Sequence, residues 1–365
     1  MAINLAIRKN PTPTVQPNTL IVPIAAVFLA VVPTAMPAQA APSFELVSVR
    51  KIWDAGAHNA FTDLTRFRNH WYCTFREADD HVGGDGRIRV LISRDGEKWE
   101  SAALLAESGI DLRDPKMSIT PDNRLMIVAG GSVYGGTRIL KSRQPRVMFS
   151  KDGFKWTLPQ RVLGDGDWLW RVVWHKGRAY GVSYDHTRAK PGDAPVLEGR
   201  GAPEWHIKLV DSADGVSWNV VTVLPVNGRP NETTIRFLPG GQCVAFIRRE
   251  GPEADRKQGW IGISKAAPYK DWTFKPAGHQ IGGPNFIVLP DGSMVGGGRD
   301  YRKAPKHVTA IGNFTLDGYS PDVELPSAGD NSYPGFVWEK GVLWTSYYST
   351  HEGKTSIYLA RIRRK

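Results

Sequence analysis

One candidate site lies in the stretch 230–250, which holds a carboxylate and a guanidinium, Glu232 and Arg248, sixteen residues apart. Alternating and apolar positions predict two strands, and Pro239-Gly240-Gly241 predicts the turn between them. Folding the stretch about this turn places residue 232 or 233 opposite residue 248. Glu232 and Arg248 should therefore meet at the end of the hairpin away from its turn, which we call the mouth end.

The same hairpin pattern occurs six times along the chain. The hairpins begin at residues 62, 114, 168, 232, 284 and 333, a repeat of roughly fifty residues that is typical of β-propeller blades. We therefore predict an all-β fold, a six-bladed β-propeller. One mouth of its channel should collect the following charged and phenolic side chains: Arg76, Asp114, Glu232, Arg248, Arg299 and Tyr333.

Residues 1–40 have the features of a secretory signal peptide. They carry Arg8 and Lys9 and no acidic residue, then a largely apolar run over 20–32, then Ala38-Gln39-Ala40, a small-residue cleavage site. A transmembrane anchor is the alternative, but thirteen residues are too few to span a bilayer comfortably. We predict cleavage after Ala40, a secreted or periplasmic protein without stable membrane insertion, and a single propeller domain over 41–365.

The chain is basic, with 47 Lys and Arg against 36 Asp and Glu and a formal net charge of +11. A basic balance suits nucleic acid, an anionic surface or an acidic substrate. No run of Lys and Arg interleaved with aromatic residues occurs, so nucleic-acid binding is not predicted. The nine His residues lack the paired spacing of a zinc site, and no phosphate-binding loop occurs, so we expect no metal and no cofactor. Cys73 and Cys243 fall in separate repeats and are predicted to be small core residues, not a disulfide.

Three short segments share the order Ser, any residue, Asp, Gly and, three residues later, Trp. They are Ser93 to Trp99, Ser150 to Trp156 and Ser212 to Trp218. We predict that each is a turn in which Asp caps backbone N–H groups, Gly takes a positive φ and Trp packs into the blade. Their role is structural.

These three segments resemble the Asp boxes of sialidases and related propellers, although each is one residue shorter between Asp and Trp than the usual form. The resemblance covers the whole of residues 41–365, including the segment from Phe75 to Asp80 and the ending from Ile357 to Ile362. It implies a sialidase-like six-bladed propeller and a glycan or glycoconjugate substrate. A monomer is expected.

The resemblance also implies a catalytic pair. Retaining sialidases use a tyrosine nucleophile, because their substrate carries a carboxylate on the anomeric carbon that would repel an anionic one. Glu232 is similar to the base that removes the phenol's proton, and Tyr333 to the phenol. The alternative is that both residues only line a polar channel.

Arg248 and Arg299 resemble two members of the arginine triad that clamps the substrate carboxylate. Arginine suits that task because its planar fork binds a carboxylate through two hydrogen bonds. We expect an arginine at the channel mouth to contribute little to folding, so Arg299→Ala should leave the fold intact. A surface arginine that is merely solvated is the alternative.

The acid that protonates the leaving group is implied to lie in the loop after the second strand of the first hairpin. Asp79, Asp80 and Asp85 are all available there, and we favour Asp80. Asp114, at the mouth, is expected to bind substrate, and it remains an alternative for the acid.

Two features of the family are missing. The first strand of the first hairpin has no arginine, and Thr355-Ser356 stands where the glutamate that steadies that arginine is expected. Arg76 and Arg113 are candidates for a substitute cation. Cleavage of a glycosidic bond is therefore a firmer expectation than sialic acid as the sugar.

Together these observations predict an exported exo-glycosidase, similar to exo-α-sialidases, that acts on a terminal acidic sugar. A hydrolase or lyase for a different glycan, neutral or sulfated, is one alternative. A non-catalytic carbohydrate-binding propeller is another, because this scaffold hosts many functions.

Overall fold

The computed structural model describes residues 10–14, 43–135, 139–187 and 204–365. The chain divides into two units, Met1–Ala40 and Ala41–Lys365, and the strands found in the described residues belong to the second. The predicted signal peptide lies outside the described residues, apart from 10–14. Among the described residues, no helix is long and apolar enough to cross a membrane.

Antiparallel β-strands make up nearly all regular structure in the described part of Ala41–Lys365. The one helix there, α1 (Ala254–Lys257), is a single turn. Three four-stranded sheets follow the chain order. They consist of β2 (His58–Phe67), β3 (His70–Ala78), β4 (Arg87–Ser93) and β5 (Glu100–Leu105); β6 (Asp111–Ile119), β7 (Leu125–Gly135), β8 (Ile139–Ser150) and β9 (Gln160–Arg161); and β10 (Asp167–His175), β11 (Arg178–Asp185), β12 (His206–Ser212) and β13 (Trp218–Leu224).

A fourth four-stranded sheet combines the two ends of the propeller. Its strand order is β1-β23-β22-β21, so the first strand pairs antiparallel with the last, from Phe44 opposite Arg364 to Trp53 opposite Ile357. The strands are β1 (Phe44–Trp53), β21 (Asn331–Glu339), β22 (Val342–Ser349) and β23 (Ser356–Arg364).

The remaining seven strands form one continuous sheet. They are β14 (Pro230–Phe237), β15 (Cys243–Arg249), β16 (Gln258–Ser264), β17 (Thr273–Val288), β18 (Met294–Asp300), β19 (Val308–Phe314) and β20 (Tyr319–Glu324). Separate four-stranded blades therefore number four in the described residues, where the sequence predicted six. The reason is β17, a strand of 16 residues whose first half pairs with β16 and whose second half pairs with β18 without a break.

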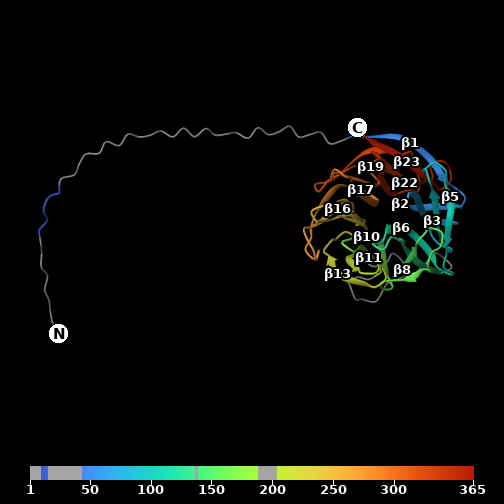
Figure 1. Cartoon of the computed structure of the whole chain (residues 1–365), viewed down its shortest axis with the longest axis horizontal. Helices are drawn as coiled ribbons and strands as arrows, with labels where there is room; N and C mark the ends of the chain where they lie inside the picture. Colours follow the sequence, from blue (N-terminus) through green and yellow to red (C-terminus); the bar gives the residue numbers. More distant parts are fainter. Residues whose placement is uncertain (1–9, 15–42, 136–138, 188–203) are drawn as a thin grey trace. The chain divides into compact units, whose positions relative to one another are not determined.

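The sheets are arranged in chain order around a central axis, as in a β-propeller (Figure 1). The strands that begin the hairpins contact one another in turn around this axis: β2, β6, β10, β14, β17 and β21. Apolar side chains fill the space between sheets, and the largest buried cluster includes Trp71, Trp170 and Tyr348. Cys73 and Cys243 belong to this cluster as free, fully buried cysteines, which confirms their predicted role.

All six predicted hairpins are present as antiparallel strand pairs. Their turns use residues that tolerate positive φ, such as Asn69, Gly177 and Gly341, as the turn signals in the sequence require. The hairpins fix which residues lie at the mouth end.

The three short Ser-to-Trp segments have the predicted turn geometry. In the first, Oδ1 of Asp95 accepts hydrogen bonds from the backbone N–H groups of Glu97 and Lys98, and Gly96 has φ of 76°. The Trp99 indole N–H donates to the Gly96 carbonyl. The segments around Asp152 and Asp214 repeat these contacts. Each turn therefore joins two strands of a sheet.

Candidate active site

A β-bulge occurs at the same place in all six hairpins, near the mouth end of the first strand. The bulged residue pairs are Phe61-Thr62, Asp114-Pro115, Trp170-Arg171, Asn231-Glu232, Gly283-Pro284 and Tyr333-Pro334. A bulge interrupts the strict alternation of a strand and re-aims its side chains. Phe61, Asp114 and Tyr333 have φ of 68°, 49° and 54°, a conformation that such residues adopt only where surrounding structure holds it. The bulges therefore set which side chains face the mouth.

Glu232 and Tyr333 meet there in a direct hydrogen bond. The phenol of Tyr333 donates to Oε1 of Glu232 over 2.5 Å. The other carboxylate oxygen, Oε2, accepts from the Gly283 backbone N–H at 2.8 Å and from Nη1 of Arg248 at 2.7 Å. Both Glu232 and Tyr333 are buried. The carboxylate is thus held in one orientation, with one oxygen left for the phenol.

The phenol of Tyr333 is neutral in this environment. Burial raises its pKa well above the usual value, and the nearby charge of Glu232 raises it further, while Arg248 opposes both effects. A buried phenol of this kind becomes a nucleophile only when a base takes its proton during the reaction. The hydrogen bond places Glu232 to do so.

Asp114 provides a second carboxyl group close to Glu232 and Tyr333. Its side chain is buried and its Oδ1 has no hydrogen-bond partner among the described residues. Desolvation raises its pKa, with Arg113 and Lys116 acting in the opposite direction. A carboxyl group with a raised pKa can hold a proton and donate it, as a general acid must.

Asp114, Glu232 and Tyr333 line one pocket of about 190 Å³. The other lining residues are Phe61, His81, Arg113, Ser132, Tyr134, Leu140, Arg143, Trp168, Tyr184 and His186. A larger hollow of about 630 Å³ contains none of the three and is lined by residues of the turns at Asp95 and Asp152. The small pocket therefore combines a phenol, the carboxylate that accepts its hydrogen bond and a second buried carboxyl group with aromatic walls, a composition suited to a sugar ring.

Arg248 and Arg299 lie near this pocket but already have partners. Arg248 donates to Glu232 and to Glu250, and its Nη1 is 3.4 Å from the Tyr333 phenol. Arg299 donates to the Asn331 carbonyl through Nε and Nη2, at 2.8 and 2.6 Å. Its Nη2 also lies 3.1 Å from Oδ1 of Asp330 and from the Tyr348 hydroxyl. Each guanidinium is thus bound to the protein's own carboxylates and carbonyls.

Arg76 and Asp80 do not reach the pocket. Arg76 is fully buried and donates to both oxygens of Asp111, at 2.7 and 3.0 Å, and to the Asp80 carbonyl. The Asp80 carboxylate caps the backbone N–H of His81. Neither residue lines the pocket. Arg76 pairs instead with Asp111 of the next sheet.

Lys116 contacts two residues that line the pocket, Phe61 and Tyr333, and the sequence did not predict it. Its side chain is buried, and Nζ donates to the carbonyls of Phe61, Thr62 and Pro115 at 3.3 to 3.4 Å. Nζ also lies 5.4 Å from the centre of the Tyr333 ring. Burial, reinforced by the charge of Arg171, lowers the pKa of Lys116 to about 8. Its position two residues after Asp114 was the only signal in the sequence.

Arg143 was missed as well. It lies at the pocket over the rings of Trp168 and Tyr184, and it donates to the carbonyls of Gly166 and Tyr184. Arg113, a candidate substitute cation in the sequence, lines the same pocket and pairs with Asp111 at 3.2 Å. Two guanidinium groups therefore border the pocket in places that the hairpin repeat does not predict.

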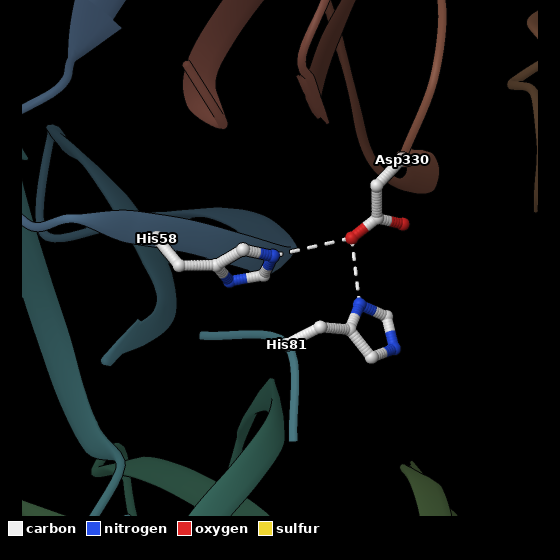
Figure 2. Close-up of side chains that lie close together, drawn as sticks. All are labelled: His58, His81 and Asp330. Atoms are coloured by element: carbon white, nitrogen blue, oxygen red, sulfur yellow. Dashed lines mark hydrogen bonds and ion pairs between the residues drawn. The ribbon is translucent and has the colours of Figure 1, made fainter. Parts of the chain in front are cut away.

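The side chains of His58, His81 and Asp330 converge on one another (Figure 2), and His81 also lines the pocket. Oδ2 of Asp330 lies 3.2 Å from Nε2 of His58 and 2.6 Å from Nδ1 of His81. Burial alone would raise the pKa of Asp330, but hydrogen bonds from both imidazoles hold it well below its usual range. Asp330 is therefore a carboxylate here.

Comparison with known proteins supports the fold. No family model matches the chain, and no curated protein matches it in sequence. Among solved structures, a protein of unknown function from Dyadobacter fermentans superposes with a TM-score of 0.72 at 20% identity, covering 89% of this chain and 100% of that one.

Two enzymes also share the fold. A Trypanosoma rangeli sialidase in complex with the inhibitor DANA gives a TM-score of 0.63 at 12% identity, and the match covers 88% of this chain and 60% of that one. An α-L-arabinofuranosidase from Fusarium graminearum, in complex with an iminosugar inhibitor, gives 0.64 at 13% identity, with 87% and 98% covered. The chain is thus an all-β propeller of the kind found in sialidases and arabinofuranosidases.

Proposed function

We propose that the protein is a retaining glycoside hydrolase in which Tyr333 is the nucleophile, Glu232 its base and Asp114 the acid. The observation that carries the proposal is the hydrogen bond of 2.5 Å from Tyr333 to Glu232, in a pocket that also holds the buried Asp114. Asp114 takes the role expected of Asp80, because Asp80 lies outside that pocket.

The first step forms a bond between the Tyr333 oxygen and the anomeric carbon. As the glycosidic bond breaks, Glu232 accepts the phenolic proton and Asp114 gives its proton to the leaving oxygen. In the second step Asp114, now a carboxylate, takes a proton from water, which attacks the same carbon. The phenol leaves and recovers its proton from Glu232, so both groups return to their starting states.

A terminal acidic sugar of the sialic acid type is the preferred substrate. A tyrosine nucleophile is an advantage where the anomeric carbon carries a carboxylate, because a neutral phenol approaches without charge repulsion. Arg113 and Arg143 border the pocket and supply positive charge for such a group.

A neutral glycan is the second candidate, and it is favoured by the state of the two expected clamp residues. Arg248 is paired with Glu250, and Arg299 with Asp330, so a substrate carboxylate would have to displace a protein carboxylate from each. An arabinose-containing glycan belongs in this class, since one solved structure with the same fold is described as an α-L-arabinofuranosidase.

Product release from a defined panel tests the proposal. The purified protein is incubated with sialosides, uronosides and arabinosides, and released sugars are measured by mass spectrometry. We expect release from one class, loss of release in Tyr333→Phe, and normal release in the control Tyr347→Phe, whose hydroxyl donates to the Pro326 carbonyl outside the pocket. Glycan binding without any release, unchanged in Glu232→Gln, would instead establish a carbohydrate-binding propeller.

Two further parts of the proposal concern export and blade number. The chain is exported and cleaved after Ala40, which N-terminal sequencing of the mature protein tests. The seven-stranded sheet acts as two blades that share β17, which makes six with the four separate sheets. Support comes from the six equivalent bulges, two of which lie in this sheet, at Asn231-Glu232 and Gly283-Pro284.

A further inference from the structure

Three potential metal ligands converge from distant parts of the chain beside the pocket. His58 begins β2, His81 lies in the loop after β3, and Asp330 directly precedes β21. The three ligand atoms, one from each residue, all lie within 4.8 Å of one another. Both imidazoles point to the same oxygen of Asp330 (Figure 2).

We infer that His58, His81 and Asp330 form a binding site for one divalent transition metal ion of the zinc type. Two imidazole nitrogens and one carboxylate oxygen are ligands that such ions prefer over the all-oxygen sets of calcium and magnesium. The inference concerns metal binding by the folded chain, and it does not depend on the proposed glycosidase activity.

One of the three distances between ligand atoms already has the length that an ion requires, and all three are within 4.8 Å. In a tetrahedral site with bonds of about 2.0 to 2.2 Å, neighbouring ligand atoms lie about 3.3 Å apart. The His58 nitrogen is already 3.2 Å from Oδ2 of Asp330, whereas the His81 nitrogen is 2.6 Å away. His81 has room to withdraw by the difference, because it lies in a loop and its side chain is 44% exposed.

The surroundings fix the carboxylate for this role. Oδ1 of Asp330 accepts hydrogen bonds from Nη2 of Arg299, at 3.1 Å, and from the Tyr348 hydroxyl, at 2.9 Å. These contacts leave Oδ2 turned toward the histidines. In metal sites generally, the ligating side chain also accepts or donates hydrogen bonds through atoms that do not touch the ion, and these bonds orient the side chain.

The tautomers of the two histidines are compatible with an ion. Nδ1 of His58 is buried and has no partner in the described part of the chain. Nδ1 can therefore carry the hydrogen of the neutral imidazole when Nε2 binds the ion. On binding, the ion takes the place of the hydrogens that Nε2 of His58 and Nδ1 of His81 now direct at Asp330.

An ion at this site would have open positions toward the pocket. Three protein ligands leave at least one position for water or a ligand oxygen, and His81 is itself a lining residue together with Asp114 and Tyr333. The ion would add positive charge at the edge of the pocket, where Arg248 and Arg299 are already neutralised by carboxylates. It would therefore provide a contact for an anionic group or a vicinal diol.

Direct metal binding tests the inference. The full chain is produced without a histidine tag, stripped with a chelator and titrated with Zn²⁺ and Co²⁺ by calorimetry, and bound metal is counted by mass spectrometry. We expect one equivalent of bound metal per chain. With Co²⁺ we expect the visible absorption that is typical of a low coordination number. His81→Leu should weaken binding at least tenfold, because it removes one of three ligands.

The control is His70→Leu, which removes a half-buried histidine at the start of β3 whose Nδ1 contacts the Arg68 carbonyl, and it should bind metal as the wild type does. His81 lies outside the core, so His81→Leu is expected to fold, which circular dichroism verifies. Less than half an equivalent in the wild type, or equal binding in His81→Leu and the wild type, would overturn the inference and leave the three residues as a hydrogen-bonded group.

Discussion

The phenol of Tyr333 lies 2.5 Å from a carboxylate oxygen of Glu232, although the two residues are 101 positions apart in the chain. Each reaches this position from a bulge in its own hairpin. The contact is within the hydrogen-bond reach that a base and its nucleophile require.

Glu232→Gln should abolish most of the activity without unfolding the protein. Glutamine keeps the shape of the side chain but does not accept the phenolic proton, so kcat/KM should fall by about 100-fold to 10,000-fold. Steady-state kinetics and a thermal melt on the same preparation measure both quantities. Unchanged turnover would show that Tyr333 needs no base, and the catalytic pair would be lost.

Asp114→Asn should affect substrates according to their leaving groups. Without the acid, release of a sugar alcohol slows strongly, whereas an aryl glycoside with an acidic phenol as leaving group needs little protonation and should react nearly normally. The matched control is Asp80→Asn, which removes a carboxylate outside the pocket. If Asp80→Asn gives the leaving-group effect and Asp114→Asn does not, the acid is Asp80.

Arg76 is predicted to contribute to stability and not to substrate binding. It is fully buried against Asp111, and breaking a buried pair by removing one partner typically costs about 3 to 5 kcal/mol. Urea unfolding of Arg76→Leu should show a loss of that size. The double variant Arg76→Leu with Asp111→Leu should recover part of it, because no unpaired charge remains buried.

Arg299→Ala is now expected to weaken the fold, contrary to the expectation from sequence. Arg299 holds the Asn331 carbonyl, Asp330 and Tyr348 together at the start of β21. Loss of hydrogen bonds from a charged donor should lower the free energy of unfolding by about 2 to 3 kcal/mol. An unchanged unfolding midpoint together with weaker binding of an acidic sugar would restore its role as a clamp.

Because Lys116 is buried, we predict that the free energy of unfolding of the protein depends on pH in an unusual way. Its pKa is lowered from 10.5 to about 8 by burial, so the cost of burying its charge is fully present below pH 8. Between about pH 8 and 10.5 the unfolded chain keeps the proton while the folded chain releases it, so stability rises with pH. Relative to Lys116→Met, the wild type should gain about 3 kcal/mol across this window.

Unfolding of both proteins in urea at several pH values measures this difference. Other titrating groups contribute to both curves and largely cancel. A difference that stays flat from pH 8 to 10.5 would mean that Lys116 remains charged in the fold.

Turn residues in the sequence were sufficient to predict the hairpins. Pairs such as Lys340-Gly341 mark the reversals, and a turn fixes which residues lie at the far end of its two strands. Glu232, Arg248 and Tyr333 were brought together correctly for this reason.

The finer details depend on contacts that no local pattern records. The bulge at Asp114 lies where its side chain lines the pocket, whereas Arg76 is paired with Asp111 and does not line it. The cluster of His58, His81 and Asp330 joins the ends of two hairpins, the first and the sixth, and has no spacing that a search for paired ligands would find. The blade count differed because β17 continues through the point at which a break was expected.

The pairing of β1 with β23 has a consequence for biosynthesis. It joins residue 44 to residue 364, so the closing sheet forms only after nearly the whole chain has been synthesised. Contacts that span so much of a chain carry a large entropic cost and slow folding. The ring should therefore stay open on the ribosome, in a state that can still be threaded through a membrane channel if the chain is exported.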